Sequence, residues 1–195
     1  MAMPPTFPAP PAALLLTPGA GSDRDHPSLL AIEAAVAPMP VARVDFPYRR
    51  AGRKSPDRPE RMVACVVEEA AALSQRTGTA PEQVVLGGRS MGGRMCSMAV
   101  AEGLSAAGLV LVSYPLHPPG RPDRLRTEHF PAVRVPCLFV SGTRDAFATP
   151  DELEAASSGV GGPVTHVWVE GAGHDLRGAD AAVAESVAAW LKRAG

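Results

Sequence analysis

The sequence predicts a three-layer α/β fold, in which helices cover both faces of a mostly parallel sheet of about six strands. Short apolar runs alternate with longer segments of helical character along the chain. The short runs are apolar at nearly every position, as strands buried on both faces must be. The chain has 195 residues, of which 46% are hydrophobic and 20% are charged. This length suits one domain with a substantial core and is short for two.

We expect a proline-rich segment over residues 1–11 and one domain over residues 12–195. The net charge of −1 gives no basic excess of the kind that favours nucleic acid or an anionic membrane. Residues 1–11 carry no basic residue and the apolar run after them is short, so neither a signal peptide nor a membrane span is predicted. The three cysteines lie far apart in apolar segments, which favours buried free thiols in a reducing, cytoplasmic setting.

The first half of the chain supplies the first three strands and two helices. Apolar or alternating runs predict the strands, and proline or glycine ends each of them. Ser28, directly after a proline, stands where a helix N-cap is expected. The clearest helix has apolar residues at spacings of three and four. The expected elements are strand 12–16, helix 29–37, strand 41–46, a basic loop over 48–59, helix 60–76 and a strand from Val84.

The second half continues the alternation of strands and helices. Its longest irregular segment, residues 114–133, lies between two apolar runs. Acidic residues begin the helix expected from Pro150, as the helix dipole favours, and Asp151 stands where its cap is expected. The expected elements are helix 94–102, strand 108–113, strand 137–141, helix 150–156, strand 164–169 and helix 179–193.

One short motif, Gly88-Arg89-Ser90-Met91-Gly92, joins the third strand to the helix after it. A strand that reverses into a helix over one residue brings its flanking backbones together and leaves no room for Cβ atoms. The G-x-S-x-G pattern between a strand and a helix is typical of a nucleophile elbow, which holds the serine in a strained conformation with its hydroxyl exposed. We therefore expect Ser90 to be a nucleophile.

Two more reactive side chains follow strand ends. Asp145 comes after the fifth strand and His174 after the sixth. Because the carboxyl ends of parallel strands share one edge of a sheet, these residues are expected near Ser90. Taken alone, Asp145 could cap a helix and His174 could be an ordinary loop histidine. The chain order Ser, Asp, His favours a triad, in which the imidazole takes the serine proton and the carboxylate orients the imidazole.

The oxyanion that forms on a carbonyl needs two hydrogen-bond donors. The N–H of Met91, directly after the nucleophile, is the first expected donor. The second is expected from the loop after the first strand, either from Ala20 or from Gly19. No metal-ligand cluster and no phosphate-binding P-loop occurs in the sequence, so we expect neither a metal nor a cofactor.

Residues that could line a substrate pocket are fewer and less specific. Gly19 belongs to the predicted oxyanion loop, and Tyr114 and His117 leave the end of the fourth strand. His117 could instead have a surface role. The arginines of the basic loop 49–58 could bind an anionic substrate, or they could pair with acidic neighbours such as Asp57 in a solvated loop.

These motifs resemble the α/β-hydrolase superfamily over roughly residues 12–193, and most of all a small dienelactone-hydrolase-like branch. The resemblance implies an α/β-hydrolase fold without a cap domain, and the triad Ser90, Asp145 and His174. Dienelactone hydrolases use a cysteine nucleophile where this chain has serine. Many relatives have a histidine where this chain has Pro18. The segments that carry the resemblance are 19–23, 46–48, 88–93, 114–120 and 142–145.

The expected function is therefore that of a serine hydrolase that cleaves a small-molecule ester or thioester through an acyl-enzyme. Transfer of the acyl group to an acceptor other than water would use the same residues. The alternative is a non-catalytic interaction module, because the branch is also similar to a eukaryotic subunit of a histone acetyltransferase complex in which the fold serves assembly. The same fold can host either role.

Overall fold

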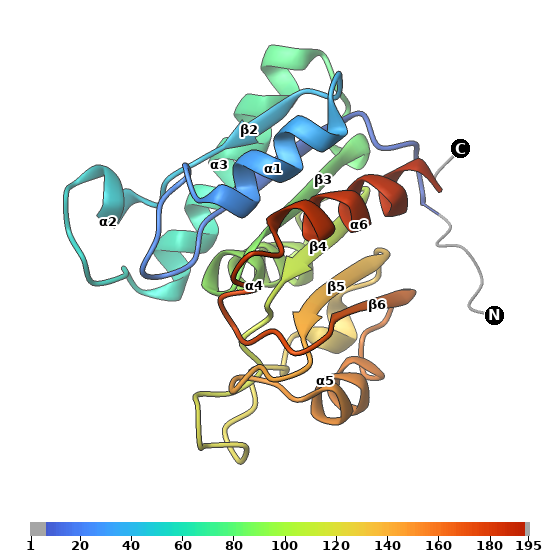
Figure 1. The fold of residues 1–195 in the computed structure, drawn as a ribbon. Coiled ribbons are helices and arrows are strands. Elements are labelled where there is room, and N and C mark those ends of the chain that lie inside the picture. Colours follow the sequence, from blue (N-terminus) through green and yellow to red (C-terminus); the bar gives the residue numbers. More distant parts are fainter. Residues whose placement is uncertain (1–6, 194–195) are drawn as a thin grey trace.

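The computed structural model describes residues 7–193, so residues 1–6 of the predicted N-terminal segment and the chain end at Gly195 lie outside the described residues. Six strands form one sheet in the order β2-β1-β3-β4-β5-β6 (Figure 1). Every neighbouring pair of strands is parallel, which confirms the predicted three-layer α/β fold. The strands are β1 (Ala13–Thr17), β2 (Val41–Arg43), β3 (Val84–Arg89), β4 (Gly108–Val112), β5 (Cys137–Gly142) and β6 (Val164–Val169).

Helices cover both faces of this sheet. Helices α1 and α6 lie side by side across one face, and α3 and α4 lie on the other (Figure 1). The helices are α1 (Pro27–Val36), α2 (Pro47–Arg50), α3 (Pro59–Thr77), α4 (Met91–Ala101), α5 (Pro150–Ser157) and α6 (Asp180–Lys192), with short 3-10 helices η1 (Pro81–Gln83) and η2 (Phe130–Ala132).

Side chains of strand β1 contribute to the hydrophobic cores on both faces of the sheet. Ala13 and Leu15 pack into the core on the α3 and α4 side, whereas Leu14 and Leu16 pack into the core under α1 and α6. Successive side chains of a strand point to opposite faces, so all four residues are fully buried. This two-sided burial explains the continuous apolar runs in the sequence.

Two predicted helix caps were wrong. His26, not Ser28, caps α1: its Nδ1 accepts from the Ser28 N–H at 3.2 Å. Thr149 caps α5 through a capping box with Glu152, so Asp151 lies inside the first turn. In both cases the true cap lies beside a proline at the first helical position, where the missing N–H costs no hydrogen bond.

The region after the second strand also differs from the prediction. Strand β2 ends at Arg43, and the predicted loop contains the short helix α2. Phe46 and Tyr48 are fully buried against the α3 side of the sheet. Burial of these two rings folds the chain inward at a place where its basic residues had predicted an open loop.

The sheet order places a crossover next to its centre. Strand β1 lies between β2 and β3. The chain that leaves β1 turns to β2 on one side, and the chain that leaves β3 turns to β4 on the opposite side. Helix α1 follows β1 on one face, and α4 follows β3 on the opposite face. The loops therefore diverge, and a crevice opens at the carboxyl ends of β1 and β3.

Helices long and apolar enough to cross a membrane do not occur within residues 7–193. The three cysteines, Cys65, Cys96 and Cys137, are free and buried. Burial raises the pKa of the Cys96 thiol to about 12, so this side chain behaves as a small apolar group at neutral pH.

The glycines around Ser90 fit a space without room for a side chain. A Cβ on Gly88 would lie 2.8 Å from the Gly93 nitrogen and would collide with the Thr17 hydroxyl. A Cβ on Gly92 would lie 2.6 Å from the Pro18 carbonyl oxygen. The turn from β3 into α4 thus depends on the close approach of three backbone segments.

Replacement of Gly88 by alanine should lower the free energy of unfolding by roughly 1–3 kcal/mol, because backbone atoms cannot yield to the added methyl group. Urea denaturation followed by circular dichroism measures this change. Gly159→Ala is the matched control, since its Cβ would meet its nearest neighbour at 3.4 Å. Equal effects of the two substitutions would contradict the tight fit at Gly88.

Candidate active site

Ser90 lies at the sharp turn between β3 and α4. Its backbone has φ 49° and ψ −118°, a region that L-residues rarely occupy and that marks strain at a functional position. Its N–H donates to the Val112 carbonyl at 2.8 Å, and its carbonyl accepts from the Arg94 N–H at 3.1 Å. The last sheet bond and the first helical bond therefore hold Ser90 from both sides.

The structure brings the three predicted reactive residues together. The Oγ of Ser90 lies 2.8 Å from Nε2 of His174. Nδ1 of His174 lies 2.8 Å and 3.0 Å from the two carboxylate oxygens of Asp145. A proton on Nδ1 satisfies the carboxylate and leaves Nε2 free to accept the serine proton. This arrangement can activate a hydroxyl for attack on a carbonyl carbon.

Asp145 is positioned by the turn after β5. Its side chain is completely buried, and Oδ1 accepts from the Phe147 N–H at 2.8 Å. The Phe147 ring stacks on the His174 imidazole, with ring centroids 4.0 Å apart. The carboxylate and the ring together fix the plane of the imidazole.

The loops after β5 and β6 support each other. The Arg144 N–H donates to the Ala172 carbonyl at 2.9 Å, and the Gly171 N–H donates to the Thr143 hydroxyl at 2.8 Å. The loop that carries Asp145 is thus bonded directly to the loop that carries His174. The distance between acid and base therefore depends on backbone bonds as well as on side chains.

Arg89, which the sequence analysis did not single out, joins this assembly. Its Nη2 donates to the His174 carbonyl at 2.9 Å, and the residue is 9% exposed. Burial lowers the pKa of its guanidinium, while the nearby Asp175 and Asp145 raise it. Its place next to the nucleophile was visible in the sequence, but its partner is a backbone carbonyl, which leaves no signal in a sequence.

The predicted oxyanion loop lies against the nucleophile. A Cβ on Gly19 would be 3.5 Å from Cβ of Ser90. The Gly19 carbonyl accepts from the Ser22 N–H at 3.2 Å. Since a trans peptide points its carbonyl and its N–H in opposite directions, this bond turns the Ala20 N–H away from the loop interior. Tyr48 Oη donates to the Ala20 carbonyl at 2.9 Å and holds the next peptide.

Met91 is the first residue of α4, where backbone N–H groups have no partner within the helix. Within residues 7–193, the amides of Ala20 and Met91 donate to no protein acceptor. Both amides are therefore available to a ligand beside Ser90.

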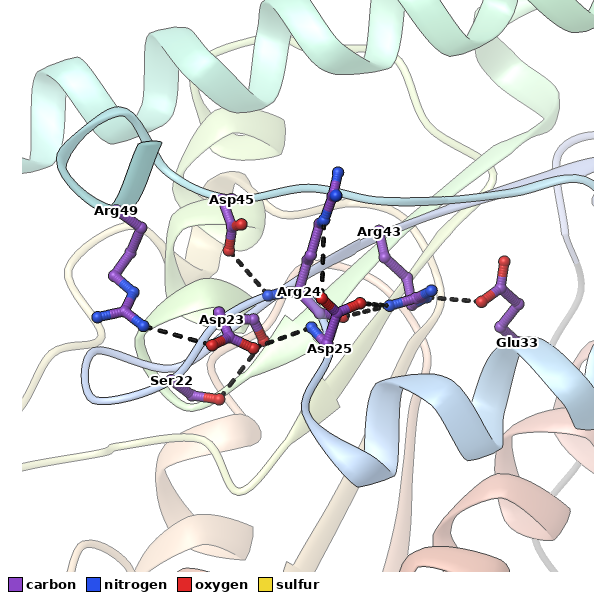
Figure 2. A network of polar contacts seen from close by, with 8 residues as sticks. All are labelled: Ser22, Asp23, Arg24, Asp25, Glu33, Arg43, Asp45 and Arg49. Carbon is purple, nitrogen blue, oxygen red and sulfur yellow. Dashed lines mark hydrogen bonds and ion pairs between the residues drawn. The ribbon is translucent and has the colours of Figure 1, made fainter. Parts of the chain in front are cut away.

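Ion pairs and hydrogen bonds fix the segment that follows the predicted oxyanion loop, residues 22–25 (Figure 2). Arg49 of α2 pairs with Asp23 at 3.3 Å. Arg43 of β2 bonds both Asp25, at 2.7 Å, and Glu33 of α1, at 2.6 Å. These contacts tie the loop to the two elements beside it, although exposed pairs of this kind add little stability each.

A cleft of about 670 Å³ lies in front of Ser90. Gly19 lines it, as do Ala20, Met91 and His174. Its remaining wall includes apolar side chains from α3 and α4, namely Met62 and Met95, and three arginines, namely Arg89, Arg94 and Arg126. The cleft thus combines apolar surface with an unusual number of guanidinium groups.

Tyr114 and His117 do not line this cleft, contrary to the prediction. Tyr114 is fully buried and donates its hydroxyl to the Arg126 carbonyl at 2.8 Å. His117 is 5% exposed, and its ring nitrogens contact the Pro118 carbonyl at 2.9 Å and Glu152 at 3.4 Å. Packing of the segment after β4 against the core turns both side chains away from Ser90.

The basic loop 49–58 forms ion pairs through its arginines and contributes one acid to the wall of the cleft. Arg50 pairs with Glu69, and Arg53 pairs with Asp57 at 2.7 Å. Arg49, Arg50 and Arg53 are therefore bonded to acids, whereas Arg58 has no ion pair among residues 7–193. Asp57 itself lines the cleft. In the part of the chain that the structure describes, no three His, Cys, Asp or Glu side chains cluster in a way that could hold a metal ion.

Comparison with known proteins identifies the fold and the family of this chain. A family model for an alpha/beta hydrolase domain matches residues 10–193. A serine hydrolase homologue from Coxiella burnetii has a similar structure, with TM-score 0.71 and 16% identity over 95% of this chain and 88% of the other. A dienelactone hydrolase from Anabaena variabilis has TM-score 0.72 and 21% identity over the same shares, 95% and 88%.

The type II thioesterase BorB from the borrelidin biosynthetic cluster has TM-score 0.66 and 22% identity over 96% of this chain and 95% of its own. At such identities these likenesses show the fold. The family model spans almost the whole chain, so the relationship extends from the fold to the sequence. The predicted resemblance is confirmed: this chain belongs to the α/β-hydrolase family.

Proposed function

We propose that this protein is a serine hydrolase that cleaves an ester or thioester through an acyl-enzyme on Ser90. The observation that carries the proposal is the hydrogen-bonded series from Ser90 through His174 to the buried carboxylate of Asp145, at the floor of a cleft. Family membership supports a hydrolase. Structural neighbours that are named serine hydrolase homologue and thioesterase support this reaction class.

In the first step, Ser90 Oγ attacks the carbonyl carbon while Nε2 of His174 takes the hydroxyl proton. The imidazolium that forms lies between the serine oxygen and the Asp145 carboxylate. Because Asp145 is completely buried and hydrogen-bonded by the Phe147 N–H, it keeps Nδ1 protonated and stabilises the positive charge.

The negative charge on the carbonyl oxygen develops beside the amides of Ala20 and Met91. Two preorganised N–H donors there stabilise the tetrahedral intermediate more than the ground state. The N-terminus of α4 adds a favourable dipole at the same point. Pro18 replaces the histidine of many relatives, and the hydroxyl of Tyr48 supplies the support that the loop has in this chain.

Collapse of the intermediate expels the alcohol or thiol, which takes its proton from His174. Water then attacks the acyl-enzyme, with His174 again as the base, and releases the acid. Transfer of the acyl group to an alcohol or amine would use the same residues, and product analysis with added acceptors distinguishes the two outcomes.

Lid-bearing relatives insert a cap between the fourth and fifth strands, where this chain has a connection too short for a separate domain. The connection from β4 to β5, residues 113–136, contains the short helix η2 and no longer element. This geometry favours short or polar acyl groups, because a long acyl chain would stay partly in water. Esters and thioesters are preferred over amides because an alcohol or thiol is a better leaving group than an amine.

A fluorophosphonate probe tests the proposal directly. We expect covalent labelling at Ser90 and hydrolysis of short p-nitrophenyl esters. If the folded protein is not labelled and leaves the esters intact, the chain is a non-catalytic module that retains the fold.

Replacement of Ser90 by alanine should lower kcat by on the order of 10⁶ and abolish labelling, because the attacking oxygen is lost. Initial rates with p-nitrophenyl butyrate measure the change. Ser158→Ala, an exposed serine at the end of α5, is the control and should keep full activity. A loss of a few-fold in Ser90→Ala would contradict the assigned role.

Replacement of Asp145 by asparagine should lower kcat by roughly 10⁴, since the amide favours the wrong imidazole tautomer. Circular dichroism verifies that the variant is folded. Asp151→Asn, an exposed position in the first turn of α5, removes a carboxylate outside the site and should have no effect. Similar rates for Asp145→Asn and the wild type would remove Asp145 from the mechanism.

A further inference from the structure

We propose that Arg94 and Arg126 form an anion subsite in the cleft, so that the preferred substrates are esters or thioesters that carry a carboxylate or phosphate group. The inference rests on the proposed function and adds the substrate class. It starts from an imbalance of charge: the acids of the cleft already have basic partners, whereas these two arginines have no acidic partner among residues 7–193.

Two carboxylates line the cleft, those of Asp57 and Asp175. Asp57 pairs with Arg53 at 2.7 Å and with Arg61 at 3.6 Å. Asp175 pairs with Arg177 at 3.4 Å. Arg53, Arg61 and Arg177 do not line the cleft. The two carboxylates of the cleft wall are therefore neutralised by arginines that lie outside the cleft.

The cationic side chains of the cleft are not compensated in this way. Neither Arg94 nor Arg126 forms an ion pair with any acid in the described range 7–193. Arg89 also lines the cleft, but its Nη2 is bonded to the His174 carbonyl. Arg126 also donates to a backbone carbonyl, through Nη1, and the Nε of Arg89 is buried without a partner, as is that of Arg94. The subsite is formed by Arg94 and Arg126 because the guanidinium of Arg89 holds the loop that carries His174, whereas their own guanidinium groups are bonded to no residue of the triad.

Arg94 stands one helical turn after the nucleophile. Residues four apart share one face of a helix, and helical side chains tilt toward the helix N-terminus. The guanidinium of Arg94 is thus directed to the end of α4 that holds Ser90. Its Nε is buried and has no hydrogen-bond partner in the protein, although a buried donor of this kind normally has one.

Arg126 is held in place although it belongs to an irregular segment. Its N–H donates to the Leu116 carbonyl at 2.9 Å, and its carbonyl accepts from the buried Tyr114 hydroxyl at 2.8 Å. One guanidinium nitrogen, Nη1, donates to the Pro115 carbonyl at 3.3 Å. These bonds fix the backbone and leave the other guanidinium N–H groups for a ligand.

The two guanidinium groups act on each other. Burial first, and the charge of Arg94 second, lower the pKa of Arg126. The same causes lower the pKa of the neighbouring His129 to about 4, so its imidazole is neutral at pH 7. Two cations that face one cleft without an anion repel each other, and a bound oxyanion relieves this repulsion through charge-assisted hydrogen bonds.

Two p-nitrophenyl esters test the subsite, namely the pentanoate and the glutarate half-ester, which carries a terminal carboxylate in place of a methyl group. We expect the wild type to have the higher kcat/KM with the glutarate ester. Arg94→Gln and Arg126→Gln should each lower kcat/KM for this ester by roughly tenfold, the low end of the range for a charged hydrogen bond. The loss with the pentanoate should be clearly smaller, so that the ratio of the two kcat/KM values, glutarate over pentanoate, falls in both variants.

Arg124→Gln is the matched control. It removes the same charge from the same segment, but Arg124 is exposed and does not line the cleft. An unchanged glutarate preference in Arg94→Gln and Arg126→Gln, or an equal loss in Arg124→Gln, would overturn the subsite. The preference should also fall as the salt concentration rises, because a charge contact is screened.

Calorimetry separates this inference from the proposed function. Glutarate and inorganic phosphate are each titrated into the wild type and the same three variants at low ionic strength, and the tighter ligand identifies the anion. Binding that is lost in Arg94→Gln and Arg126→Gln supports the subsite even if no ester is hydrolysed. Absence of binding by both anions, together with equal ester rates, refutes it while hydrolysis of the pentanoate still supports the enzyme.

Discussion

The close packing of β3 against β1 at the start of α4 is the constraint on which the whole site depends. Thr17, at the end of β1, donates its buried hydroxyl to the Gly87 carbonyl at 3.1 Å. That contact fills the space in which Gly88 and Gly92 would otherwise carry side chains. The chain can then turn within one residue, which leaves Ser90 with a strained backbone and a partly exposed position at the carboxyl end of β3.

The same crossover explains why Ser90 and the amides proposed as oxyanion donors lie close together. Strands β1 and β3 are neighbours, yet the helices after them cover opposite faces of the sheet. Their loops separate in front of the sheet edge and bring the Gly19–Ala20 loop against Ser90. Asp145 and His174 come from the other half of the sheet, and Arg89 connects the halves through the His174 carbonyl.

The remaining wall of the cleft follows a different principle. Side chains at strand ends are held rigidly by the sheet. The segment between β4 and β5 is irregular, and such segments commonly carry the residues that vary between related proteins. In this chain the buried ring of Tyr114 anchors that segment and its hydroxyl holds Arg126. A core residue that does not line the cleft thereby positions a charge that does.

The sequence by itself determined the alternation of strands and helices, and it placed Ser90, Asp145 and His174 at strand ends, because periodicity and glycine turns are local properties. Only the tertiary structure decided which side chains after β4 reach the cleft. The path of an irregular segment depends on packing between distant residues, so Tyr114 turned inward where the sequence had indicated a pocket residue. Hydrogen bonds to backbone carbonyls, such as that of Arg89, arise only when separate loops meet.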